Sequence, residues 1–264
     1  MLIAAALAIA PSASPSPTPI PDPCGSILSI VTRPTVTTSV CTVRTGSVLV
    51  ENGYANTVTT GPGGGVTVSY PQSLVRLGSN DAHLEADVIA PSFNRSSLGG
   101  TSESGWGDFG MGAKAELGYS ARWLYGANAA ITYPTGSRVF SAGNPQLTGD
   151  FNWAYTVNSI IGLSGTMSFN ALSGLNPAGT AQSYFAFIPS IVVAATLPGS
   201  SEYYVEYSYF SRAGPNLTGR SLIDTAYLRD LGPNVQLDVE YGFSPTLLDG
   251  QKEHYVGAGI SFMI

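Results

Sequence analysis

Three titratable residues alternate along one short stretch of the chain and are the first candidates for chemistry. His83, Glu85 and Asp87 occupy positions i, i+2 and i+4, so an extended backbone places their side chains on one face. Three such groups could bind a metal ion. They could also form ion pairs with Lys114 and Arg122, which lie in the same phase on the following segments. We expect the ion-pair network, with no metal site and no other cofactor.

Neither hydrolytic chemistry nor nucleotide binding is favoured elsewhere in the sequence. A hydrolase needs a nucleophile beside a base, and the histidines are His83, to which no serine is spaced in a recognisable motif, and His254. His254 falls in phase with the apolar residues of the last predicted strand. Residues 105–110 fit the spacing GxGxxG, but a nucleotide loop needs a strand before it and a helix after it. Here a predicted loop precedes and a predicted strand follows, so we expect a protein that is not an enzyme.

The elements that carry these residues are predicted to be β-strands. Residues 235–243, VQLDVEYGF, alternate apolar side chains with Gln236, Asp238 and Glu240. Alternation with a period of two predicts a half-buried strand, and similar segments of about ten residues recur along the chain. The expected strands are 47–56, 65–77, 81–90, 107–119, 122–133, 147–157, 161–171, 183–197, 202–212, 221–231, 235–244 and 254–264.

The connections between the predicted strands alternate in length. Short ones are expected near 78–80, 119–121, 158–160, 198–201 and 232–234. Longer ones are expected near 57–64, 91–106, 134–146, 172–182, 213–220 and 245–253. This alternation is typical of an outer-membrane barrel, which has tight periplasmic turns and longer external loops.

Composition also favours a membrane barrel over a soluble domain. Charged residues make up 11% of the chain and hydrophobic residues 44%, whereas an average soluble protein has about 25% charged residues. The net charge of −6 argues against a nucleic-acid partner. The apolar faces are rich in Tyr and Trp, as in the aromatic girdles of barrels. We predict an all-β fold: a transmembrane, antiparallel, up-and-down β-barrel of about twelve strands.

The polar faces of these strands carry the residues that we expect to line the lumen and set its selectivity. They are His83, Glu85, Asp87, Asp108, Lys114, Glu116, Arg122, Asp150, Glu206, Asp238 and Glu240. Acidic groups predominate, so the lining would favour neutral-polar or cationic solutes.

The N-terminal part differs in composition from the predicted barrel, which takes residues 45–264. Residues 1–14 resemble the apolar core and small-residue end of a secretory signal. Residues 15–44 form a Pro-rich linker and a segment with both cysteines, Cys24 and Cys41. In an exported protein such a pair is expected to form a disulfide. The segment is either a periplasmic lead-in fixed by that disulfide or a plug that enters the lumen.

Residues 104–137 resemble a known family. A Gly-rich turn with Gly107 and Asp108 enters a strand with Gly112 and Lys114, and the next strand ends in Pro134-Thr135-Gly136. This pattern resembles the bacterial outer-membrane transporter family of the phenol-degradation meta-pathway ("MetA-pathway of phenol degradation" family). The resemblance extends over 45–264 and implies an outer-membrane barrel of a Gram-negative bacterium that transports small compounds, aromatic ones among them. Barrels of this class commonly end on an aromatic residue, whereas this chain ends on Ile264.

These observations predict a channel or transporter for passive passage of small molecules across the outer membrane. The expected partners are outer-membrane lipid, small-molecule solutes and the outer-membrane assembly machinery, with no nucleic acid. Two alternatives remain open: a structural or adhesive barrel with a closed lumen, and a secreted soluble β-domain.

Overall fold

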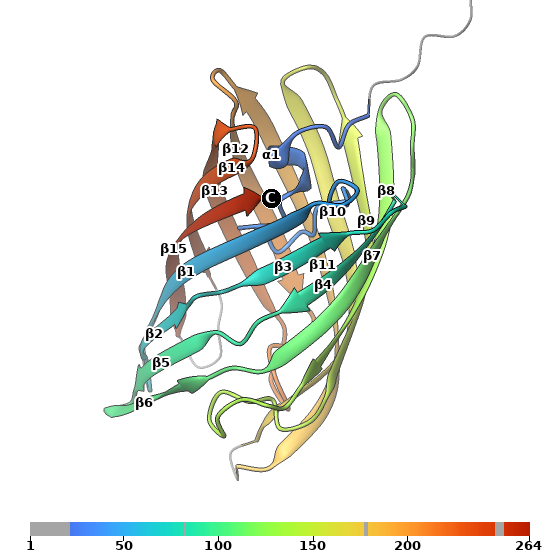
Figure 1. The fold of residues 1–264 in the computed structure, drawn as a ribbon. Helices are drawn as coiled ribbons and strands as arrows, with labels where there is room; N and C mark the ends of the chain where they lie inside the picture. The colour runs from blue at the N-terminus through green and yellow to red at the C-terminus, as the bar shows by residue number, and fades with distance from the viewer. Residues whose placement is uncertain (1–21, 82, 177–178, 246–250) are drawn as a thin grey trace, which may run out of the picture.

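The computed structural model describes residues 22–81, 83–176, 179–245 and 251–264, and within them one sheet accounts for almost all regular structure (Figure 1). The predicted signal segment 1–14 lies outside the described residues. The elements are α1 (Ile27–Ile30), β1 (Val48–Thr60), β2 (Gly65–Tyr70), β3 (Leu74–Gly78), β4 (Leu84–Ile89), β5 (Phe93–Leu98), β6 (Thr101–Trp106), β7 (Phe109–Tyr119), β8 (Trp123–Tyr133), β9 (Gln146–Thr156), β10 (Ile161–Leu175), β11 (Ala181–Leu197), β12 (Ser201–Phe210), β13 (Arg220–Gly232), β14 (Val235–Ser244) and β15 (Lys252–Met263). Among the described residues, no helix is long and apolar enough to cross a membrane.

The sheet closes into an antiparallel barrel of twelve strands, as predicted. Each strand pairs with its sequence neighbour, and β15 returns to pair with β1 in a register that joins Met263 to Leu49. The fifteen segments make twelve strands because β2 with β3, β4 with β5, and β6 with β7 each form one interrupted strand. Closure leaves no unpaired edge where the strands meet, which is how a sheet can satisfy its backbone in lipid.

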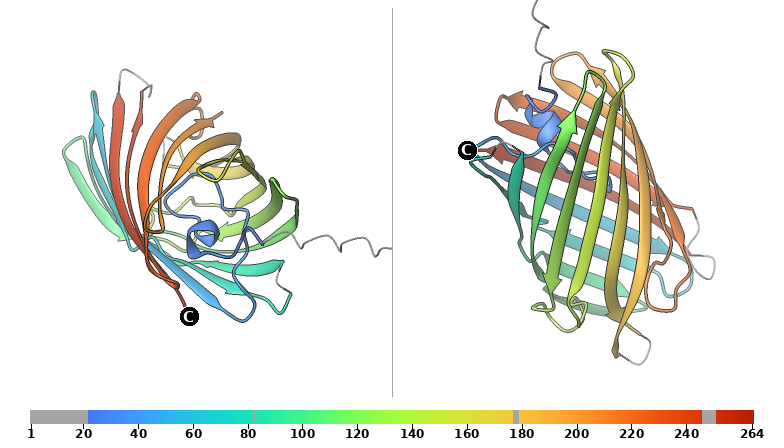
Figure 2. Two further views of the ribbon diagram at one scale, coloured as in Figure 1. Left: turned by 90° about the horizontal axis from the view of Figure 1, so that it is seen from above. Right: turned by 90° about the vertical axis from the view of Figure 1, so that its right-hand side faces the viewer.

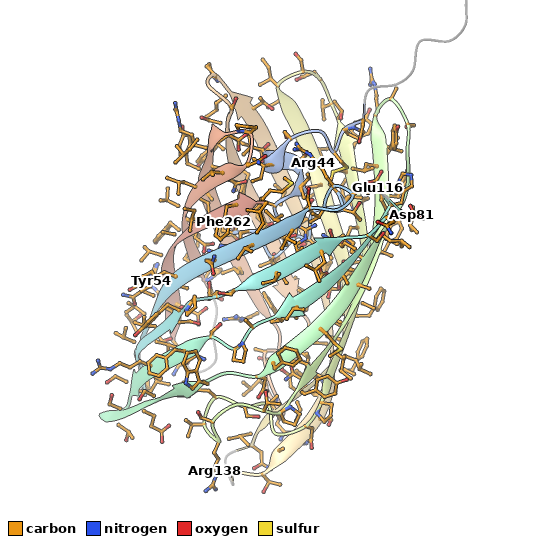
Figure 3. The ribbon with its side chains drawn as sticks, in the orientation of Figure 1. Arg44, Tyr54, Asp81, Glu116, Arg138 and Phe262 are labelled. Carbon is orange, nitrogen blue, oxygen red and sulfur yellow. A yellow bond between two sulfur atoms is a disulfide. The ribbon has the colours of Figure 1, made fainter. Side chains whose placement is uncertain are left out.

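The alternation in β14 shows which face is inside. Gln236 and Asp238 are almost completely buried, whereas Val239 between the carboxylates of Asp238 and Glu240 is 55% exposed. The polar face therefore points into the barrel and the apolar face points outward. Tyr54 on β1 projects from the outer surface in the same way (Figure 3).

The two ends of the barrel differ in their connections. We call the end with Asp81 the turn end, because the connections there, such as 120–122 and 198–200, are short. We call the opposite end, with Arg138, the loop end (Figure 3). The loop predicted over 91–106 is wrong, because β5 and β6 extend the wall there and meet at Gly99 and Gly100. Both glycines have positive φ, as a tight hairpin turn requires.

The loop-end wall is completed by a connection rather than by a strand. Within the described residues β6 pairs with β5 alone. The connection between β8 and β9 lies along β6, where the Ser137 N–H donates to the Trp106 carbonyl at 2.8 Å. Asp108 fixes this connection by accepting hydrogen bonds from the N–H groups of Gly136 and Ala142, each at 2.8 Å. The residues of the Gly-Asp and Pro-Thr-Gly motifs therefore meet in space.

Candidate functional site in the barrel lumen

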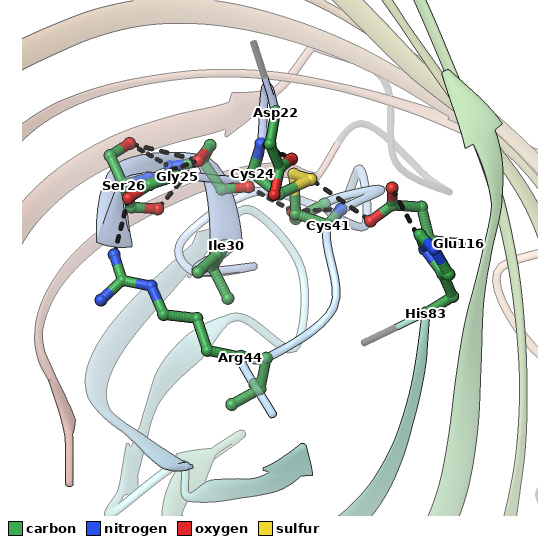
Figure 4. Close-up of a disulfide and its surroundings, with 12 residues drawn as sticks. Asp22, Cys24, Gly25, Ser26, Ile30, Cys41, Arg44, His83 and Glu116 are labelled. Atoms are coloured by element: carbon green, nitrogen blue, oxygen red, sulfur yellow. Dashed lines mark hydrogen bonds and ion pairs between the residues drawn. A yellow bond between two sulfur atoms is a disulfide. The ribbon is translucent and has the colours of Figure 1, made fainter. Parts of the chain in front are cut away.

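Residues 22–47 lie inside the turn end of the barrel, and we call them the plug (Figure 2). Of the two alternatives for this segment, the structure has the one that enters the lumen. The predicted disulfide joins Cys24 and Cys41 with their Cα atoms 5.4 Å apart (Figure 4). Ile27 and Ile30 of α1 are buried with it in an apolar cluster that also includes Leu49, Leu124 and Met263 of the wall. The disulfide and this cluster therefore fix the plug against the wall.

A buried group of opposite charges fixes one side of the plug to the wall. Arg76 on β3 is fully buried, and its guanidinium contacts Glu51 on β1 at 2.9 Å and Glu85 on β4 at 2.8 Å. It also donates to two carbonyls of the plug, those of Ile30 at 2.5 Å and Cys41 at 2.9 Å. A buried cation is tolerated only when it is paired and hydrogen-bonded in this way.

Three wall carboxylates accept hydrogen bonds from the plug backbone. Glu51 accepts from the N–H groups of Thr32 and Arg33 at 3.1 and 3.0 Å, and Glu85 accepts from Val43 at 2.6 Å. On the opposite wall, Glu206 of β12 accepts from the N–H groups of Val36 and Thr37 at 2.8 and 2.7 Å. The Thr37 hydroxyl also donates to Glu206 at 2.6 Å. Hydrogen bonds to an ionised carboxylate are among the stronger ones in proteins, so the plug is anchored on both sides of the lumen.

Arg33 extends from the plug toward β14 and β15. Its guanidinium lies 3.6 Å from Asp238 and 3.9 Å from Glu240, and it donates to the Gln72 side chain at 3.1 Å. Gly53 makes room for it, because a Cβ atom at that position would overlap the guanidinium. A close approach of this kind is one reason for glycine within a strand.

The remaining predicted lining residues have several different partners. Asp87 lies 4.0 Å from Arg76, and Lys114 is buried with its amine 3.3 Å from Glu85. His83 is 3.7 Å from Glu116 at the turn end, beside the disulfide (Figure 4). The described residues contain no group of three His, Cys, Asp or Glu side chains that could hold a metal ion.

Three more predicted lining residues lie apart from the charged group. Asp150 accepts a hydrogen bond from the Asn128 side chain at 2.6 Å. Asp108 holds the connection along β6, and Arg122 is exposed in a turn, where it donates to the Tyr155 hydroxyl at 3.2 Å. The role of the eleven predicted residues in selectivity remains a prediction.

Sequence reasoning missed three residues that organise this site: Arg33, Glu51 and Arg76. Glu51 and Arg76 each interrupt an apolar stretch of a predicted strand, Glu51 in SVLVENG and Arg76 in SLVRLG. Glu51 shares its phase with Ser47 and Gly53, which was the available signal. Arg76 instead falls in phase with Val66 and Tyr70, on the apolar face of the predicted strand 65–77. The structure interrupts that strand between β2 and β3, so the phase changes and Arg76 points inward. Arg33 belongs to the plug, and no periodicity assigns a residue of an irregular segment to a face.

Two cavities flank the plug. One, of about 620 Å³, lies at the turn end between the plug and strands β8 to β13. The other, of about 350 Å³, lies between the plug and wall residues that include Gln72, Arg220 and Tyr255. Arg33 and Thr35 line both cavities. This part of the plug is therefore the partition between them.

Comparison with known proteins supports the barrel fold. No protein-family model matches the chain, and no curated protein matches it. Among solved structures, the COG4313 outer membrane channel from Pseudomonas putida F1 is similar, with a TM-score of 0.68 and 13% identity over 85% of this chain and 98% of that chain. The NanC porin is similar with a TM-score of 0.54 and 8% identity, over 80% of this chain and 98% of that chain.

A third similar structure is named as a translocator domain rather than as a channel or porin. The translocator domain of the autotransporter NalP from Neisseria meningitidis has a TM-score of 0.53 and 9% identity, over 84% of this chain and 90% of that chain. At these identities the likeness concerns the fold alone. The three share a β-barrel of the outer membrane, and the resemblance to the MetA-pathway family remains a prediction.

Proposed function

We propose that this protein is an outer-membrane channel for the passive passage of small molecules and that its plug narrows the route. The observation that carries the proposal is the pair of cavities that meet at Arg33 and Thr35. A barrel that served only as a structural wall would have no need of two lumen cavities that share Arg33 and Thr35. The names of the channel and the porin among the similar structures support transport rather than catalysis.

The proposed orientation places the turn end in the periplasm and the loop end outside the cell. Bacterial barrels have short periplasmic turns and longer external loops. The longest connections between strands of this barrel, 134–145 and 211–219, lie at the loop end, although the β5–β6 turn there is tight. The outward-facing Tyr, Val and Leu side chains would contact the lipid of a Gram-negative outer membrane. Insertion would use the assembly machinery that such barrels share.

The proposed route runs from the loop end through the smaller cavity, past Arg33, into the larger cavity. Asp238 and Glu240 lie beside Arg33 and give this point its net charge. We propose that these three side chains set the charge preference of the channel. Aromatic compounds remain the proposed cargo on the strength of the sequence resemblance.

Single-channel conductance of the refolded protein, compared with the Arg33→Ala variant, tests this route. The variant removes the Arg33 side chain from the partition and so widens the route between the two cavities. It also leaves Asp238 and Glu240 without their cation, so we expect a higher conductance and a shift of selectivity toward cations. Arg44→Ala is the matched control, because Arg44 belongs to the plug but donates to the Gly25 carbonyl at 2.6 Å, away from the partition. The control should conduct as the wild type does.

The closed structural barrel is the alternative outcome of the same experiment. The hydrogen bonds that the plug N–H groups donate to the wall carboxylates favour that alternative, because they stabilise the occluded state. If neither the wild type nor Arg33→Ala conducts ions or swells liposomes with small sugars, the channel proposal is overturned.

A further inference from the structure

The larger cavity has the size and lining of a small-molecule site. Its volume of about 620 Å³ falls within the range of about 300–1,000 Å³ that is typical of such sites. The plug contributes Leu28, Val31 and Val40, and the wall contributes Leu124, Val192 and Leu228. These six side chains form an apolar surface against which a hydrocarbon or aromatic body would be stabilised by burial.

Glu202 supplies the cavity with a carboxyl group that has no counter-ion in the part of the chain that the structure describes. It is the second residue of β12 and shares its inward phase with Tyr204 and Glu206. Among the described residues, no Lys, Arg or His side chain forms an ion pair with Glu202. The other two charged lining residues, Arg33 and Arg122, direct their guanidinium groups to other partners.

Asp230 on β13 adds a second carboxyl group at this end of the cavity. It interacts electrostatically with Glu202, and its Oδ1 atom is buried without a hydrogen-bond partner among the described residues. Two carboxylates that are close together and poorly solvated favour a cation nearby. The same charges oppose an anionic ligand.

We propose that the larger cavity binds a small apolar molecule that carries a single amine, such as an arylalkylamine or a short alkylamine. The ammonium group contacts Glu202 and the apolar body lies on the Leu124, Val192 and Leu228 surface. The inference rests on the proposed channel function in that it names a class of solute for the same lumen. Binding itself requires only the cavity and does not depend on passage.

Equilibrium binding of para-fluorophenethylamine, followed by fluorine NMR on the full-length protein in lipid nanodiscs, tests the proposal. The neutral comparison ligand is para-fluorophenethyl alcohol, which has the same apolar body. A charge-assisted hydrogen bond should make the amine bind about tenfold more tightly than the alcohol. Nanodiscs keep detergent out of the cavity.

Two variants and a control make the test specific. Glu202→Gln preserves the shape of the side chain, so we expect it to weaken amine binding about tenfold and to leave alcohol binding unchanged. Ala194→Phe places a ring in the cavity from β11 and should abolish binding of both ligands. Glu103→Gln removes a charge from exposed β6 and should change neither affinity. Heat-modifiable gel migration confirms that each variant has refolded.

The outcomes separate this inference from the channel proposal. Equal affinities for amine and alcohol, or an amine affinity that Glu202→Gln does not change, overturn the amine site. If the protein conducts ions but fails this binding test, the amine site is overturned and the channel proposal stands. If it binds the amine through Glu202 but does not conduct, the amine site stands and the channel proposal is overturned.

Discussion

At the scale of single residues, Arg76 connects two strands of the wall to the plug. Its guanidinium neutralises Glu51 and Glu85 and donates to two carbonyls of the plug. Both carboxylates in turn accept hydrogen bonds from backbone N–H groups of the plug. The side chains are fully or almost fully buried, so the removal of one partner leaves the others without compensation.

We predict that Arg76→Leu lowers the free energy of unfolding by about 3–5 kcal/mol, because it leaves the buried Glu51 carboxylate without its cation and leaves Glu85 paired with Lys114 alone. Urea titration of the refolded protein, followed by tryptophan fluorescence, measures the loss. Arg95→Leu is the control: Arg95 is exposed on β5, and its replacement should cost about 0.5 kcal/mol or less. Similar losses in the two variants would contradict the role assigned to Arg76.

At the scale of elements, the plug is an irregular segment whose structure depends on its contacts. Its only helix, α1, is four residues long and is capped by Ser26, which accepts a hydrogen bond from the Ser29 N–H at 3.2 Å. An isolated helix of this length is not stable in water. The disulfide, the apolar cluster around Ile27 and Ile30, and the wall carboxylates provide the stability that local structure lacks.

Loss of the disulfide should therefore loosen the turn-end part of the plug while the barrel stays intact. We predict that the double variant Cys24→Ser with Cys41→Ser is cleaved by trypsin after Arg44 at least tenfold faster than the oxidised wild type, because the cross-link would contribute roughly 3 kcal/mol. The measurement is the time course of cleavage, with the heat-modifiable migration of the barrel as the internal control. An unchanged rate would show that the wall contacts alone fix this part of the plug.

At the scale of the whole molecule, the outer face and the lumen have opposite chemistry. Along β14 the outward side chains are Leu237, Val239 and Tyr241, whereas Gln236 and Asp238 are buried inside. The proposed membrane location requires this outer face to lie in hydrocarbon. A charge placed there should then cost more at mid-height than near the ends.

We predict that Val239→Lys, near the middle of β14, lowers the free energy of unfolding in lipid vesicles by about 2–4 kcal/mol. Leu197→Lys, at the turn end of β11 and also on the outer face, should cost about 0–1 kcal/mol. The comparison uses the same urea titration for both variants. If Val239→Lys costs no more than Leu197→Lys, the outer face is not in the hydrocarbon of a bilayer.

The sequence alone determined the closed form, the number of strands and the faces of the cleanly alternating ones such as β14, but not β5 and β6, which lie in a predicted loop. The alternation in residues such as 235–243 is a local property, and it assigns each charged residue to the polar face of its strand. The low charge of the whole chain then indicates that the apolar face contacts something other than water. The disulfide could also be predicted from a short segment, because Cys24 and Cys41 are close in the sequence. Twelve strands and the disulfide are confirmed for these reasons.

Only the tertiary structure decided what the lumen charges contact. Strands give each residue a face but not a partner across the barrel, so Glu206 could equally have met a solute or, as it does, the backbone of Val36 and Thr37. The plug has no periodicity that assigns it a place, and Arg33 meets Asp238 more than two hundred positions along the chain. Closure of the barrel brings such distant residues together, because contacts across a lumen depend on register and curvature rather than on local sequence.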